Sequence, residues 1–292
     1  MLGAPCREGA VSVCGLRQGG SLAFFRFSSL VLAAGLFVVI LGATALGHIV
    51  GRSVRDKSEG LREPFGVMQA AMLGFMGLVL AFGISLAVGR YENRRAAVVE
   101  EANAIGTTYL RAQTLPEPSR TRSLELLRDF TDTSIRISRT VPSSTDQDDA
   151  LVRSGRAERA LWTEAGRALE AEPTASSVRL YVESLNETFD AQSSVVFGLR
   201  NRVPTAVLAL EIVGAAIALG LLALHLATLG RGLTPVLVAS ALVTLTLMIT
   251  FDLDRPVRGL IQVSDAPLTQ LRAPMEEPPA VDAPAPSTTG SG

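Results

Sequence analysis

Residues 65–109 read FGVMQAAMLGFMGLVLAFGISLAVGRYENRRAAVVEEANAIGTTY. The first part, 65–88, carries no charged residue and is longer than the roughly 20 residues that a helix needs to cross the hydrocarbon core of a bilayer. From Val98 to Tyr109, apolar residues recur at spacings of three and four, opposite charged residues such as Glu101, which is the pattern of an amphipathic helix. The stretch therefore predicts one continuous helix that leaves a membrane and enters an aqueous helical domain.

Three other stretches are comparably long and apolar: 27–49, 205–229 and 233–251. The chain is 48% hydrophobic but only 19% charged, and its charged residues gather between these stretches, as they do in membrane proteins. We predict an all-α integral membrane protein with four transmembrane helices and a cytoplasmic helical-bundle insert between the second and the third. Ala43-Thr44-Ala45 also fits a signal-peptidase site, whose cleavage would leave three spans. The apolar run continues past it to Val50, which favours an uncleaved first span.

The predicted spans divide the chain into six parts. These are a leader at 1–26 that we expect to be poorly ordered, transmembrane helices at 27–89, the insert at 90–203, transmembrane helices at 204–251, a membrane-proximal amphipathic segment at 252–272, and a disordered tail at 273–292. The tail is rich in Ala, Pro, Ser and Thr and has little apolar surface to bury, which is why we expect disorder there.

Breaks in the helical pattern divide the insert into four helices. A pair of prolines just beyond the amphipathic helix ends it, and a break at 141–144 ends the next helix. Asp146 or Asp148 can cap the third helix, and Ser176 or Ser177 can start the fourth. The insert is therefore predicted to be a helical bundle that continues into two membrane helices.

The orientation in the membrane follows from the positive charges near the spans, because loops that stay in the cytoplasm carry an excess of Lys and Arg. One side has Arg7, Arg17, Arg26, Arg90, Arg94, Arg95, Arg200, Arg202, Arg255 and Arg258, and the other has Arg52, Arg55, Lys57, Arg62 and Arg231. We therefore expect a multi-pass protein of the inner (plasma) membrane with both termini and the insert in the cytoplasm.

Small residues follow one face of the second predicted span. Their spacing is four within each of two sets and three between the sets, so all of them lie along one slowly drifting face. They are Gly66, Ala70, Gly74, Gly77, Ala81, Ser85 and Gly89. Such a face lets another helix approach closely. Two interpretations stay open: packing against another span of the same chain, or a subunit contact or pore-lining face.

Two ionisable side chains, Glu211 and His225, lie within the third span. A charge there is costly and normally faces the protein interior or water. Helical geometry puts the two on one face but about 21 Å apart along the axis, so they cannot touch. Glu211 is either a carboxylate solvated or paired near the membrane boundary, or a group that takes part in ion selectivity or proton movement.

Charged residues also gather where the fourth span ends, at Asp252, Asp254, Arg255 and Arg258. Glu101, in the helix that continues from the second span, is expected at the same membrane surface, where it would form an ion pair with Arg255 or Arg258. Two carboxylates are far fewer than the six to eight oxygens that calcium prefers, so we expect no metal site.

The sequence has none of the residue patterns that usually mark an enzyme. It has no Gly-rich phosphate loop and no Gly-x-Ser-x-Gly motif, and it has only two histidines. We therefore expect no catalytic residues, no cofactor and no enzymatic activity. A basic stripe with interleaved aromatic residues is also absent, so we expect no binding of nucleic acid.

Two runs carry a family resemblance. VEEANAIG at 99–106, with Leu115-Pro116 after it, and DLDRPVRG at 252–259 resemble the bacterial membrane family described as having a bestrophin-like domain. The likeness extends from about residue 30 to residue 272. It implies four spans with a cytoplasmic helical insert. Because true bestrophins are pentameric anion channels, it also implies a homo-oligomer in a lipid bilayer that conducts anions.

A second interpretation is a non-conducting membrane scaffold or sensor whose insert binds a cytoplasmic partner. A pore formed between subunits requires an oligomer, whereas a simple anchor does not. The number of subunits therefore discriminates between the two interpretations.

Overall fold

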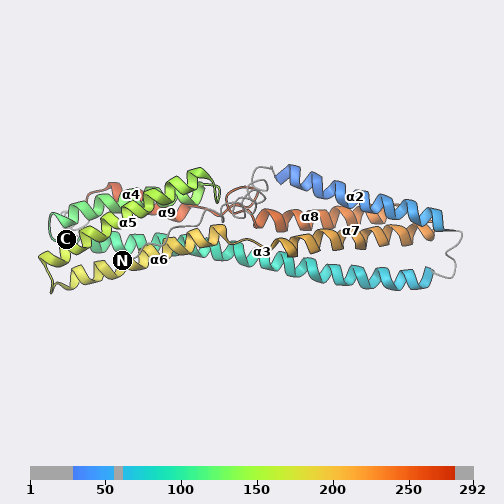
Figure 1. Cartoon of the computed structure of the whole chain (residues 1–292), viewed down its shortest axis with the longest axis horizontal. Helices are drawn as coiled ribbons and strands as arrows, with labels where there is room; N and C mark the ends of the chain where they lie inside the picture. Colours follow the sequence, from blue (N-terminus) through green and yellow to red (C-terminus); the bar gives the residue numbers. More distant parts are fainter. Residues whose placement is uncertain (1–28, 56–61, 280–292) are drawn as a thin grey trace, which may run out of the picture. The chain divides into compact units, whose positions relative to one another are not determined.

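The computed structural model describes residues 29–55 and 62–279, and within them it contains helices and no strand (Figure 1). The helices are α2 (Ser29–Val54), α3 (Arg62–Ala112), α4 (Ser119–Arg139), α5 (Thr145–Ala171), α6 (Ser176–Arg200), α7 (Thr205–Thr228), α8 (Thr234–Leu253), α9 (Ala266–Arg272) and the 3-10 helix η3 (Ala273–Glu276). The all-α prediction is confirmed for these residues. The predicted leader at 1–26 and the end of the tail, from residue 280, lie outside them.

The chain forms two compact units. The first, here called the membrane unit, comprises the described residues of Met1–Tyr91 and Arg202–Gln262. The second, the insert unit, comprises those of Glu92–Asn201 and Val263–Gly292. Helix α3 contributes to both units, which confirms the continuous helix predicted from residues 65–109.

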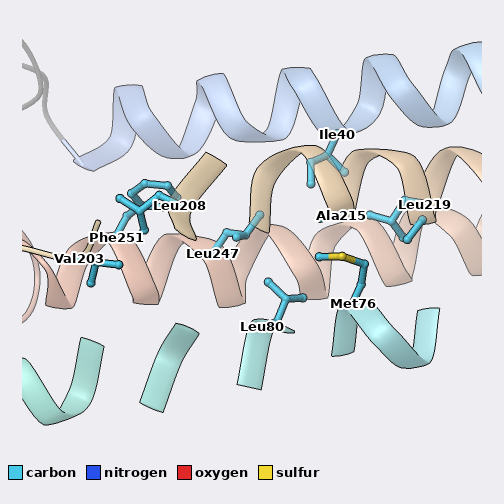
Figure 2. Packing of buried hydrophobic residues seen from close by; sticks show 10 residues of the cluster. Ile40, Met76, Leu80, Val203, Leu208, Ala215, Leu219, Leu247 and Phe251 are labelled. Carbon is cyan, nitrogen blue, oxygen red and sulfur yellow. The ribbon is translucent and has the colours of Figure 1, made fainter. Parts of the chain in front are cut away.

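The membrane unit is built from apolar helices. Among the described residues, four helices are long and apolar enough to cross a membrane, and their apolar parts lie in α2, α3, α7 and α8. Figure 2 shows buried side chains from all four meeting in one cluster: Ile40 of α2, Met76 and Leu80 of α3, Leu219 of α7 and Leu247 of α8. This cluster is the core of the membrane unit.

Helices α2 and α7 approach each other closely at the backbone level. A β-carbon placed on Gly47 would collide with the carbonyl group of Gly220, and one placed on Gly51 would lie 2.7 Å from the Ala227 Cβ. Small residues allow membrane helices to pack at this separation. The sequence analysis missed this contact, although Gly47 and Gly51 have the spacing of four that it recognised in α3.

In the insert unit, α4, α5 and α6 join the last part of α3. A buried hydroxyl cluster links α3 to α6: Thr108 Oγ1 donates to the carbonyl oxygen of Ser184 over 2.9 Å and lies 2.8 Å from Thr188 Oγ1. Arg94, only 3% exposed, donates from its side chain to the carbonyl oxygens of Gly198 and Asn201. These bonds join α3 to the part of α6 that runs from Ser184 to its C-terminal end.

The start of α5 differs from the prediction. Its N-cap is Ser144, whose side-chain oxygen accepts a hydrogen bond from the backbone N–H of Gln147 over 3.2 Å. The two predicted caps, Asp146 and Asp148, lie inside the first turn instead. Acidic residues are also favourable there, because they face the positive end of the helix dipole.

The segment after α8 is not one amphipathic element. Its first part belongs to the membrane unit, and α9 belongs to the insert unit. There Arg139 on α4 pairs with Asp265 over 2.6 Å, and Arg272 on α9 pairs with Asp132 on α4 over 2.7 Å.

The start of the predicted disordered tail is ordered, which corrects the prediction for these residues. Residues 273–276 form η3, and Met275 is 1% exposed. Arg128 Nε donates to the Met275 carbonyl oxygen over 2.6 Å, and Tyr109 Oη donates to it over 3.2 Å. The chain stays ordered as far as η3 because the side chain of Met275 is buried and its carbonyl group accepts hydrogen bonds from Tyr109 on α3 and Arg128 on α4.

Candidate functional site

The small-residue face of α3 stays open in the part of the chain that the structure describes. Ala70, Gly74, Gly77, Ala81, Ser85 and Gly89 are all exposed. A β-carbon placed on Gly74, Gly77 or Gly89 would meet nothing within 4 Å. Helix α3 instead packs against its own unit with Met76, Leu80, Gly83 and Ala87, which are buried. Packing of the predicted face against another span, the first of the two open interpretations, is therefore not observed for these six residues within residues 29–55 and 62–279.

Large apolar side chains are also exposed on this helix. Phe75 is 53% exposed, Leu78 55% and Phe82 63%. An extended apolar surface of this kind marks contact with lipid or with another protein surface. The open side of α3 therefore combines small residues, which allow close approach, with large side chains that bury apolar area.

Gly66, the first member of the predicted face, contacts another helix. It is half-buried, and a β-carbon on it would lie 3.2 Å from Cε1 of His225 on α7. The imidazole therefore lies over the glycine, near the start of α3. This contact accounts for His225 as a packing residue of the membrane unit.

Glu211 is fully buried on α7. Neither of its carboxylate oxygens has a hydrogen-bond partner among the described residues. A β-carbon placed on Gly83 of α3 would collide with this carboxylate, so the side chain fills the notch that the glycine leaves. Glu211 and His225 both face α3, at different levels, as their spacing predicted. Of the two interpretations left open for Glu211, pairing near the membrane boundary is not observed among the described residues.

Three of the charged residues at the end of α8, Asp252, Asp254 and Arg255, are buried, and Asp254 is 0% exposed. Its Oδ1 accepts a hydrogen bond from the Val203 backbone N–H over 2.8 Å, and its Oδ2 pairs with Arg202 Nε over 3.3 Å. Because Val203 lies just before α7, this carboxylate ties the start of α7 to the end of α8. Arg202, which the sequence analysis left out of the cluster, is one of its members.

Asp252 organises the chain reversal that follows α8. Its Oδ2 accepts hydrogen bonds from the backbone N–H groups of Leu260 and Ile261, over 2.7 and 2.8 Å. Gly259, which directly precedes Leu260, has a φ of +128°, and a β-carbon there would collide with the Asp252 carboxylate. A glycine is required at this position for both reasons.

Arg255 completes this group and is 1% exposed. Burial lowers the pKa of its guanidinium, and the nearby carboxylate of Asp252 acts in the opposite direction. Arg258, by contrast, is exposed. The carboxylates of Asp252 and Asp254 bind backbone N–H groups and an arginine, so the cluster holds together the ends of α7 and α8.

Glu101 is not part of that cluster. It is 1% exposed in the insert unit, and neither of its oxygens has a hydrogen-bond partner among the described residues, so the predicted ion pair with Arg255 or Arg258 is wrong. Burial raises the pKa of Glu101 to about 7, and the polar side chains of Ser134 and Gln192 limit the rise. Its carboxyl group therefore lies in the interior of the insert unit.

Polar residues from two neighbouring helices, Ser134 of α4 and Gln192 of α6, lie next to Glu101. Gln192 of α6 donates through Nε2 to Oγ of Ser134 on α4 over 2.8 Å, and its Oε1 accepts from Oγ of Ser154 on α5 over 2.5 Å. All three are buried. The insert unit thus has a polar layer in its interior. Within the described residues, no group of three or more His, Cys, Asp or Glu side chains could hold a metal ion.

The comparisons with known proteins agree with this geometry. A family model described as a bestrophin-like domain matches residues 34–268. A crystal structure of a bacterial bestrophin homolog from Klebsiella pneumoniae that carries a single substitution has a TM-score of 0.65 at 15% identity, over 82% of this chain and 97% of that one. Another crystal structure of the homolog from the same organism has a TM-score of 0.62 at 16% identity, over 82% and 96%. No protein with a curated description matches the chain. At these identities the structural likeness shows a common fold.

Proposed function

Because the chain belongs to the bestrophin-like family, we propose that it forms a homo-oligomeric membrane channel that conducts anions. The resemblance to true bestrophins, which are anion channels, supports the choice of ion. The same resemblance supports a homo-oligomer. In a homo-oligomer, a neighbouring subunit would pack against the open side of α3.

The observation that carries the proposal is the open small-residue face of α3. A membrane helix gains little from exposing glycines to lipid, whereas close helix packing or a narrow pathway makes use of them. Within this proposal, the face from Ala70 to Gly89 lines or seals the pathway between subunits. Gly66 lies outside that role, because it already contacts His225.

The proposal includes four membrane-spanning helices, α2, α3, α7 and α8, with both termini and the insert unit in the cytoplasm of a cell with an inner membrane. The arginines near the spans support this orientation. The buried state of Arg94 and Arg255 does not change it, because both residues belong to the side that carries the larger number of positive charges.

Anion flux into liposomes that contain the purified chain tests the proposal. We expect flux from the natural sequence, together with an oligomer in detergent by light scattering. Gly77→Trp and Ala81→Trp should abolish the flux while the oligomer still forms. Val38→Trp is the matched control, because Val38 is 67% exposed on α2 and should tolerate the larger side chain.

A monomer in detergent, or liposomes that show no flux under any anion gradient, would contradict the channel. Those results would favour the second interpretation, a membrane-anchored scaffold or sensor. Flux that both tryptophan variants leave unchanged would contradict the role given to the α3 face alone.

A further inference from the structure

A groove of about 510 Å³ lies between α4 and α5 on the insert unit. Its walls include Leu126 from α4 and Ala157 and Ala160 from α5, which are apolar. Three arginines line the same groove: Arg136 from α4, and Arg153 and Arg156 from α5. The volume lies within the range of sites that hold small molecules.

The three arginines differ from most others in the insert unit. The arginines that bind a carboxylate or a backbone carbonyl group there are Arg94, Arg95, Arg111, Arg120, Arg122, Arg128, Arg139, Arg167, Arg200 and Arg272. In the described part of the chain, the guanidinium groups of Arg136, Arg153 and Arg156 have no such partner. Their charge is therefore available to a ligand.

The carboxylates in the groove do not cancel this charge. Asp132 is held by Arg272, whose Nε and Nη2 donate to its two oxygens over 2.7 and 3.2 Å. Asp129 is left as the one lining carboxylate that is not engaged by an arginine, against three arginines. The groove thus attracts an anion on balance, and Asp129 weakens that attraction.

We propose that this groove binds a small organic anion that bears a phosphate group. A guanidinium presents paired N–H donors that match the oxygens of a phosphate, and arginines on two facing helices can contact it from both sides. The apolar walls would take the body of such a ligand. A ligand bound here would bridge α4 and α5, and the site is separate from the proposed pathway along α3.

Calorimetric titration of the full-length chain in detergent, with inorganic phosphate and pyrophosphate as probes, tests the proposal. We expect saturable binding of pyrophosphate that equimolar chloride does not displace. The double variant Arg136→Ala, Arg156→Ala should weaken the binding by about tenfold or more, since each lost charge-assisted contact is a large fraction of the affinity. Arg159→Ala, on α5 but outside the groove, is the matched control and should change the affinity less than twofold.

A gain-of-affinity variant makes the test independent of folding defects. Asp129→Asn removes the free carboxylate and should tighten pyrophosphate binding several-fold. Absence of binding by both probes, or equal affinity in the natural chain, the double variant and Asp129→Asn, would overturn the proposal.

The phosphate could belong to a soluble molecule or to a lipid headgroup. The same titration in phosphatidylcholine nanodiscs, with and without phosphatidic acid, separates these sources. A soluble ligand predicts equal pyrophosphate affinity in both, whereas a headgroup ligand predicts competition by phosphatidic acid. In either case the Arg136 and Arg156 substitutions must reduce the binding.

Discussion

The carboxylate of Glu211 on α7 occupies the space above Gly83 on α3 that any other residue at that position would fill. Both residues are buried in the membrane unit. The pair fixes the level of α3 against α7, together with Met76 of α3, whose sulfur would collide with a β-carbon on Gly214. Gly83 on α3 thus packs against the side chain of Glu211 on α7, and Gly214 on α7 packs against the side chain of Met76 on α3.

Gly83→Ala should therefore destabilise the protein by about 1–3 kcal/mol, the usual cost of overpacking a well-packed interior. Glu211→Ala in the same chain should recover most of that loss, because it empties the notch. Thermal unfolding in detergent measures both. Gly42→Ala, where a β-carbon meets nothing within 4 Å, is the control and should have little effect. Equal effects of Gly83→Ala and Gly42→Ala would argue against this contact.

Gly259 gives a second prediction, at the turn after α8. Gly259→Ala should cost about 1–3 kcal/mol, because an alanine is strained at a φ of +128° and its β-carbon collides with Asp252. Gly232→Ala, in the loop between α7 and α8, has no such collision and serves as the control. Chemical denaturation followed by circular dichroism compares the two. A smaller loss at Gly259 than at Gly232 would show that the turn does not depend on the glycine.

The sequence predicted the helices well, because helix formation depends largely on local properties. Length and hydropathy are enough to recognise a helix in 65–88, and periodicity is enough to recognise its amphipathic continuation. The sequence pattern does not show which other helix a given helix packs against. Gly47 and Gly51 of α2 pack against α7, whereas the small residues of α3 face outward, and no property of either sequence pattern tells these cases apart.

Glu101 was assigned to the charged face of its helix, although its spacing places it on the apolar face. It lies three residues after Val98 and four before Ile105, both of which are buried, so helical geometry puts it on the apolar face. The predicted ion pair with Arg255 or Arg258 rested on the expectation that Glu101 lies at the same membrane surface as these arginines. Its true neighbours, Ser134 and Gln192, come from other helices, so only the tertiary structure could identify them.

The buried carboxyl of Glu101 makes the stability of the insert unit depend on pH. Burial raises the pKa of Glu101 from 4.5 to about 7 in the folded state, so between these values the folded state holds a proton that the unfolded state has lost. Its contribution to stability is fully present below about pH 4.5 and is lost as the pH rises to about 7. The total change is on the order of 3 kcal/mol, from 1.36 kcal/mol per pKa unit.

Glu101→Gln should remove this slope, since the amide keeps the shape and cannot ionise. Thermal unfolding at intervals between pH 5 and pH 8 measures it for the natural chain and the variant. Glu100→Gln, at an exposed position next in sequence, is the matched control and should leave the slope unchanged. A slope that persists in Glu101→Gln would mean that another group is responsible.

The central claim is that the open small-residue face of α3 borders the pathway for anions. The most direct test is chemical modification of single cysteines during flux, in a chain whose two natural cysteines, Cys6 and Cys14, are replaced by serine. An anionic, membrane-impermeant methanethiosulfonate reagent should reduce the anion flux of the Ala81→Cys variant to the level of protein-free liposomes, and should leave the flux of Val38→Cys unchanged. Full flux after complete modification of Ala81→Cys would contradict the claim.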